Sequence, residues 1–161
     1  MPKRNYEPGD FKLAVRRARA GLGLFAADAI PKGACIIEYV GKELTDDEYN
    51  ASRSRYLFDI GGGKVIDGSP RWNRARYINH SCAPNCEPEL RKRHVYIFAL
   101  RDIAAGEELA YDYGTEYFEQ YLGKNCRCPK CMPEYPPREQ SVPVATRESP
   151  ATVEAQESAA A

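Results

Sequence analysis

Short apolar stretches, broken at close intervals by glycine and proline, run through the first 115 residues. Residues 11–17, 24–27 and 34–40 are rich in apolar and β-branched side chains, which favour strands. The turn formers at 21–23 and 31–33 separate these three segments. This spacing predicts a series of short strands rather than long helices.

The same pattern continues further along the chain. Residues 56–60 and 64–67 flank three consecutive glycines, a pattern typical of a β-hairpin. Residues 94–100 read as a buried strand and residues 109–113 as a shorter one. The sequence therefore indicates a mostly-β domain.

Helix signals are few. Thr45 is followed three residues later by Glu48, which is the pattern of a capping box at a helix N-terminus. A second short helix is predicted over residues 115–121. Beyond Cys131 the chain is rich in proline, glutamate, serine and alanine without apolar periodicity, so residues 133–161 are predicted to be a disordered tail.

Charge and hydropathy exclude several classes of function. The chain has 23 Lys+Arg and 23 Asp+Glu residues, so it lacks the excess of basic residues that nucleic-acid-binding proteins usually show. The local basic cluster of Lys12, Arg16, Arg17 and Arg19 could serve a phosphate or an acidic surface, but a solvated strand edge explains it better. No run of 18 apolar residues is present, so we expect no membrane association. The expectation is an intracellular monomer, cytoplasmic in a bacterium and nuclear or cytoplasmic in a eukaryote.

Six cysteines in such a protein point to metal binding or redox chemistry rather than to disulfides. Three of them lie close together at Cys126, Cys128 and Cys131. Cys128 and Cys131 alone would match a thiol redox pair. The third neighbouring cysteine, and the lack of a strand-to-helix context, favour a metal site.

Five motifs occur in a fixed order, and together they resemble the SET family of protein-lysine methyltransferases. They are GLGLFA (21–26), EYVG (38–41), RYINHSCAPNC (76–86), GEELAYDYG (106–114) and CRCPKC (126–131). The resemblance covers roughly residues 11–131. The fourth and especially the third motif make it specific.

This resemblance implies a SET fold, with short strands in small sheets, few short helices and an active site built by a pseudoknot. It divides the chain into a short leader (1–10), a SET domain (11–115), a post-SET zinc segment (116–132) and the tail (133–161). It also implies a methyl donor, S-adenosylmethionine, and a substrate lysine in a protein or peptide. Histone tails are the family's best-known substrates.

Three tyrosines match the family's catalytic positions. Tyr113 would place its hydroxyl near the methyl-transfer site and orient the amine. Tyr39 would line the lysine channel, and Tyr111 would restrict the product to mono- or dimethyllysine. An apolar aromatic channel suits this chemistry, because desolvation lowers the pKa of the lysine and frees its lone pair. Aromatic faces also attract the cationic sulfonium.

Seven residues are implied as cofactor contacts by their places in the motifs. They are Gly21, Leu22, Gly23, Tyr56, Asn79, His80 and Arg127. Among them, Asn79 would meet the amino-acid end and the backbone of His80 would meet the adenine.

The resemblance also implies one structural zinc ion, held by Cys126, Cys128, Cys131 and Cys82. Cys86 is the rival fourth ligand. The final gap in the cysteine motif is two residues, where the family more often has four. A non-catalytic SET-fold module that binds peptides is the alternative to an enzyme, and degeneration of the motifs, which would favour it, is not seen.

Overall fold

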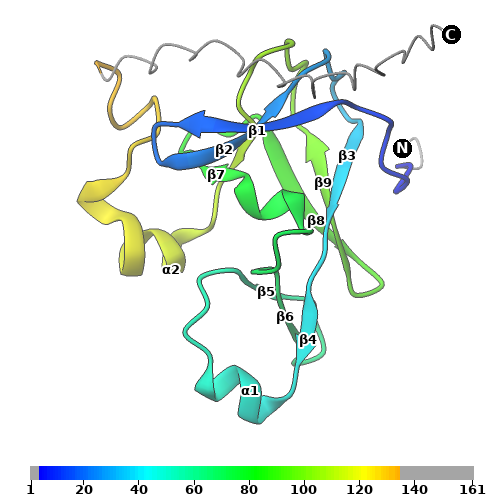
Figure 1. The fold of residues 1–161 in the computed structure, drawn as a ribbon, viewed down its shortest axis with the longest axis vertical. Coiled ribbons are helices and arrows are strands. Elements are labelled where there is room, and N and C mark those ends of the chain that lie inside the picture. Colours follow the sequence, from blue (N-terminus) through cyan, green and yellow to red (C-terminus); the bar gives the residue numbers. More distant parts are fainter. Residues whose placement is uncertain (1–3, 135–161) are drawn as a thin grey trace, which may run out of the picture.

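Ten short strands form four small sheets within residues 4–134, the part of the chain that the computed structural model describes (Figure 1). The strands are β1 (Leu13–Ala18), β2 (Gly21–Ala26), β3 (Cys35–Tyr39), β4 (Lys42–Leu44), β5 (Leu57–Asp59), β6 (Val65–Asp67), β7 (Asn79–His80), β8 (Cys86–Arg91), β9 (His94–Ala99) and β10 (Ala110–Tyr111). This architecture confirms the predicted mostly-β fold.

Three of the sheets are antiparallel and one is parallel. β1 pairs with β2, β9 lies between β3 and β8, and β6 lies between β4 and β5. The parallel pair joins β7 to β10, two strands that are far apart in the sequence. In Figure 1, β4, β5 and β6 form a lower lobe with the helix α1 (Asp46–Ala51), while the other sheets make up the upper body.

The predicted local signals produce the expected elements. Thr45 Oγ1 accepts from the Glu48 N–H, and Glu48 Oε2 accepts from the Thr45 N–H at 2.9 Å, so the capping box is formed at α1. The three glycines before β6 all have positive φ, which allows the tight reversal between β5 and β6. The second predicted helix is present but irregular: α2 (Thr115–Tyr117) continues into the π-helical turn η2 (Phe118–Leu122) and the 3₁₀ turn η3 (Gly123–Asn125).

The turn predicted at residues 21–23 is wrong. Gly21 and Gly23 belong to β2, where Gly23 pairs with Arg16 across the hairpin, and the reversal occurs at Arg19 and Ala20. Glycine is required at position 23 of this strand, because neighbouring groups leave no room for a side chain there.

Among the elements that were not predicted are β8 and the 3₁₀ turn η1 (Arg74–Tyr77). β8 contains Pro88, which argues against a central strand. The proline is tolerated because β8 lies at the edge of its sheet and, within the part of the chain that the structure describes, pairs with β9 alone. η1 contains Arg76 and Tyr77, the first two residues of the third motif, and β7 follows after Ile78.

Residues 109–111, the segment that ends in β10, are hydrogen-bonded on two sides, and we call this arrangement the clasp. The Leu109 N–H donates to Leu24 O of β2 at 2.8 Å, while the next two residues pair with β7. The core lies along this clasp, with Leu24, Ile78 and Leu109 among its fully buried side chains. This interlacing of distant segments is the arrangement expected of a pseudoknot.

The N-terminal segment rests on β8. The Arg4 guanidinium pairs with Glu87 at 3.1 Å and also with Glu89, and the Tyr6 hydroxyl donates to Glu89. Beyond residue 134, the predicted tail lies outside the described residues. No helix in residues 4–134 combines the length and apolar character that crossing a bilayer requires.

Candidate active site

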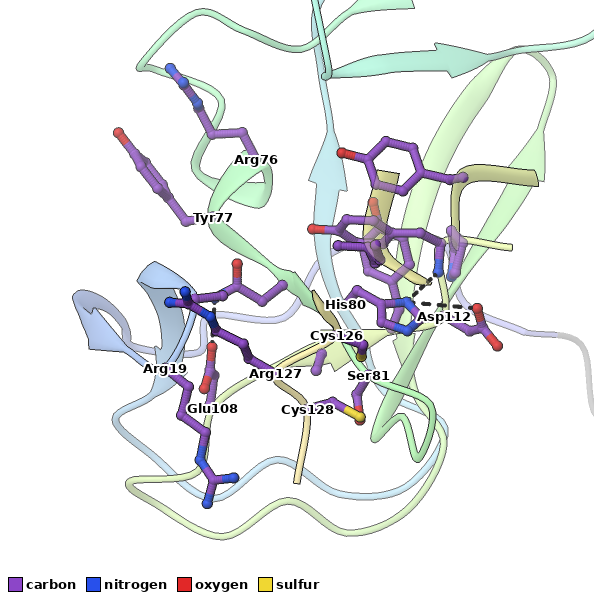
Figure 2. A pocket seen from close by; sticks show the side chains of 18 of the residues that line it. Arg19, Arg76, Tyr77, His80, Ser81, Glu108, Asp112, Cys126, Arg127 and Cys128 are labelled. Carbon is purple, nitrogen blue, oxygen red and sulfur yellow. Dashed lines mark hydrogen bonds and ion pairs between the residues drawn. The ribbon is translucent and has the colours of Figure 1, made fainter. Parts of the chain in front are cut away.

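A large open cavity of about 1210 Å³ lies beside the clasped segment. β2, η1, β7, β10 and the cysteine segment all contribute to its wall (Figure 2). Most of the predicted site residues line it, namely Leu22, Tyr39, Tyr56, Asn79, His80, Tyr111, Tyr113, Cys126, Arg127 and Cys128. Gly21, Gly23, Cys82 and Cys131 are not part of the wall.

The hydroxyl of Tyr113 is held in one orientation. It donates its proton to the backbone carbonyl of Ile78 at 2.6 Å. Burial raises the pKa of Tyr113 well above its ordinary value, so the phenol stays protonated near neutral pH. Because its only proton is engaged, the oxygen can act toward the cavity as an acceptor and not as a donor.

Aromatic rings form the wall around Tyr113. The Tyr111 and Tyr117 rings lie 4.9 Å and 5.0 Å from it between centroids. Tyr39 and Phe58 form another pair, 5.2 Å apart. All five line the cavity, so this end is suited to exclude water and to attract a cation.

Tyr39 is fixed by a backbone contact. Its hydroxyl donates to the carbonyl of Tyr56 at 2.9 Å, and burial raises its pKa. A Cβ at Gly68 would lie 2.3 Å from the Tyr39 oxygen, so only glycine allows this close approach. The ring is therefore locked in the wall.

The amide of Asn79 is oriented by two acceptors. Its Nδ2 donates to Leu22 O at 3.0 Å and to Glu108 Oε1 at 2.7 Å. With both N–H groups engaged, the carbonyl oxygen is the group that Asn79 has left to offer a ligand. A ligand ammonium would satisfy that oxygen.

Glu108 is a site residue that the sequence analysis did not select. It lines the cavity and its burial raises the pKa of its carboxyl group, although the Asn79 amide and the Arg19 guanidinium oppose the shift. A Cβ at Gly23 would stand 2.5 Å from Glu108 Oε1. Gly23 therefore makes room for this carboxylate. The sequence feature that could have identified Glu108 is its place in the motif GEELAYDYG.

Arg76 is the second residue that was missed. Its guanidinium carbon lies 4.3 Å from the centre of the Tyr56 ring, and its Nε is buried without a hydrogen-bond partner among residues 4–134. The sequence feature that could have identified Arg76 is its position directly before Tyr77, at the start of the third motif. Figure 2 shows Arg19, Glu108 and Arg127 gathered at one end of the cavity, away from Arg76 and Tyr77.

Four cysteines come together at the edge of this cavity, and two of them, Cys126 and Cys128, belong to its wall. The Sγ atoms of Cys82, Cys126, Cys128 and Cys131 lie within 4.8 Å of one another, with 3.7 Å between those of Cys82 and Cys131. Tetrahedral zinc with Zn–S bonds of about 2.3 Å requires sulfurs about 3.8 Å apart, so the four side chains fit this ion.

The surroundings of Cys128 favour loss of its thiol proton. Burial alone would raise its pKa, but backbone hydrogen bonds from Cys82 and Cys131 outweigh this and lower the pKa to about 6. The rival ligand Cys86 is fully buried, and its thiol donates to Ala110 O at 3.3 Å instead. The geometry favours Cys82 as the fourth member.

Comparisons with known proteins agree with this geometry. The family model described as the SET domain matches residues 21–114. The chain is 43% identical over 134 residues to a histone-lysine N-methyltransferase, H3 lysine-4 specific, from Chaetomium globosum, covering 73% of this chain and 12% of that protein. The protein of the same description from Saccharomyces cerevisiae is 41% identical over 135 residues, covering 74% of this chain and 12% of its own length.

A solved structure is also similar. The crystal structure of Arabidopsis thaliana SUVH6 in complex with SAM superposes with a TM-score of 0.64 at 31% identity, covering 75% of this chain and 31% of that one. The chain thus spans about a tenth of the length of these fungal relatives, and about a third of the plant structure.

Proposed function

Because this chain belongs to the SET-domain family, we propose that it transfers a methyl group from S-adenosylmethionine to a lysine side chain of a protein. The observation that carries the proposal is the Tyr113 hydroxyl, held by Ile78 O inside an aromatic cavity and next to a polar end suited to an amino-acid group. The relatives' names concern histone lysines, so histone tails are the first substrates to test.

We propose that the polar end of the cavity holds the cofactor. Asn79 would accept from the α-ammonium group, and the carboxylate of Glu108 would add a favourable negative charge. Leu22 and Arg127 also line the cavity here, as expected for cofactor contacts. The remaining cofactor assignments, at Gly21, Gly23, Tyr56 and His80, stay predictions. Bound S-adenosylmethionine supplies an electrophilic sulfonium methyl.

The aromatic wall would act on the substrate lysine. Tyr39, Tyr111 and Tyr113 would exclude water, which disfavours the ammonium form of the lysine and lowers its pKa. The Tyr113 oxygen, unable to donate, would accept from the amine and align its lone pair. Tyr113 would not serve as a base, since its raised pKa keeps it protonated and its proton is already engaged.

A direct test is to incubate the protein with labelled S-adenosylmethionine and either histones or a cell lysate, and to map modified lysines by mass spectrometry. Methyl-lysine in a defined protein would support the enzyme. Tight cofactor binding without transfer to any protein would favour a non-catalytic peptide-binding module instead. The expected intracellular location and monomeric state remain predictions.

Replacing Gly23 by alanine should weaken cofactor binding. The new Cβ would lie 2.5 Å from Glu108 Oε1 and 2.8 Å from Ala18 Cβ, so the carboxylate must move away from Asn79. We expect a loss of about tenfold in cofactor affinity, or about 1.4 kcal/mol, by calorimetry. Gly63→Ala is the control for a strained glycine substitution away from the cavity: its positive φ of 72° should make the variant less stable, while cofactor affinity should stay unchanged. Unchanged affinity in Gly23→Ala would remove Glu108 from the cofactor site.

Tyr111→Phe should raise the methylation state of the product. Tyr111 is 8% exposed and lies in the cavity wall, where its hydroxyl can hold a water in the space that a first methyl group must enter. We expect mono- and dimethyllysine from the unmodified protein, and more highly methylated lysine from the variant. Mass spectrometry over a long time course with excess cofactor measures this. Predominant trimethyllysine from the unmodified protein would contradict the role of Tyr111.

A further inference from the structure

The imidazole of His80 lies between the loop of Tyr113 and the four cysteines. Its Nδ1 is 3.2 Å from the backbone N of Tyr113, and its Nε2 is 3.2 Å from Cys82 Sγ. The side chain is only 4% exposed. The rings of Tyr113 and Phe118 pack against it at 5.4 Å and 5.5 Å. Figure 2 shows His80 beside Asp112, with Cys126 and Cys128 below it in this view.

These contacts determine which nitrogen of His80 carries the proton. A backbone N–H can only donate, so Nδ1 must offer a lone pair to Tyr113. An imidazolium carries a proton on both ring nitrogens, so the acceptor role of Nδ1 toward Tyr113 excludes the charged form of the ring. The neutral ring has a single N–H. Because Nδ1 is the unprotonated acceptor, that proton is on Nε2 and points at Cys82 Sγ.

Asp112 does not change this assignment. Its Oδ1 lies 3.8 Å from His80 Nδ1, and its side chain is 60% exposed. An ion pair would need a proton on Nδ1, where the Tyr113 N–H already points. The carboxylate is therefore a distant charge and not a hydrogen-bond partner of the ring.

The geometry points to His80 as a positioning residue that donates an N–H···S hydrogen bond to the Cys82 thiolate of the metal site and, through Nδ1, fixes the backbone of Tyr113. One imidazole then joins the proposed zinc site to the loop of the proposed catalytic tyrosine. This rests on the proposed function. A hydrogen bond to a ligand sulfur orients the ligand and slows its release from the metal.

The backbone of His80 is held independently of this ring. His80 pairs with Tyr111 in the parallel sheet, and the Ser81 N–H donates to Tyr111 O at 3.0 Å. The backbone hydrogen bonds of this strand therefore do not depend on the His80 side chain. This allows the two contacts of the imidazole to be removed separately.

Two substitutions by amide side chains separate the two hydrogen bonds of the imidazole. In His80→Asn the amide oxygen takes the place of Nδ1 and can accept from Tyr113, but the side chain is too short to reach Cys82. In His80→Gln the amide nitrogen takes the place of Nε2 and can donate to Cys82, while the Tyr113 N–H loses its acceptor. The full chain is purified with zinc, and its release to a chromophoric chelator is timed.

We expect His80→Asn to release zinc about 10- to 100-fold faster than the unmodified protein. His80→Gln should release zinc at nearly the unmodified rate. Turnover on a verified lysine substrate should show the reverse order, with His80→Gln the more impaired. In cobalt-substituted protein, the thiolate-to-metal charge-transfer band should shift in His80→Asn and not in His80→Gln. Asp112→Asn is the control and should leave zinc release unchanged.

Equal zinc release in both His80 variants, whether fast or unchanged, would overturn the inference, because a mere packing role cannot distinguish the two amides. Faster release in Asp112→Asn would also overturn it, in favour of a charge effect. Purified unmodified protein without zinc would refute the metal site itself, and methyl transfer measured on the same sample shows whether the proposed enzyme survives that result.

Discussion

Tyr113→Phe is expected to lower turnover by about a hundredfold or more while the affinity for the cofactor stays nearly unchanged. The substitution keeps the ring that packs against Tyr111 and Tyr117, and removes only the oxygen proposed to align the amine. Single-turnover kinetics on a verified lysine peptide, with cofactor affinity by calorimetry, separates the two quantities.

Removing this hydroxyl also leaves the Ile78 carbonyl without its donor, which costs about 1–3 kcal/mol of stability if no water replaces it. Tyr6→Phe is the matched control, because it removes a hydroxyl hydrogen bond to Glu89 on β8. We expect the control to change the melting temperature without changing turnover. Unimpaired turnover in Tyr113→Phe would exclude Tyr113 from the reaction.

Cys128→Ser should abolish zinc binding and methyl transfer together. Three remaining thiolates would leave the fourth position to water and weaken the site, and a structural zinc ion contributes about 10 kcal/mol or more to local folding. Cys126, Arg127 and Cys128 line the cavity, so loosening their segment would open the wall and lower activity by about a hundredfold or more. Elemental analysis of protein purified without chelator should find one zinc ion in the unmodified chain and none in the variant.

Cys86→Ser is the control for this result. Cys86 donates to Ala110 O inside the core, and serine can make the same contact, so zinc content should not change. The opposite pattern, with zinc retained in Cys82→Ser and lost in Cys86→Ser, would place Cys86 in the metal site.

Local signals in the sequence predicted local structure well. Thr45 and Glu48 form the expected capping box, because both groups of the motif lie within one turn of helix. The glycine triplet forms the expected reversal, since its residues adopt the positive φ that glycine tolerates. β8 was missed because Pro88 disfavours a central strand, and only the pairing with β9 shows that it is an edge.

The site was predictable where the motifs determine position, and not where a contact depends on distant parts of the chain. Asn79 and Tyr113 reach the cavity as the resemblance implies. The role of Glu108 was hidden, because it depends on the missing Cβ of Gly23 on another strand. The proton on His80 Nε2 likewise follows from a backbone N–H more than thirty residues away.

The clasp around the segment ending in β10 has a consequence for how the site forms. Its hydrogen bonds join Leu109 to Leu24, and Ala110 pairs with Asn79, so each contact closes a long loop of chain. Contacts of high sequence separation form late, since the loop-closure entropy must be overcome before they stabilise anything. Tyr111 and Tyr113 lie within or just beyond this segment. We therefore expect the hairpins and the capped helix to form before the cavity, so that methyl transfer would report the completion of folding.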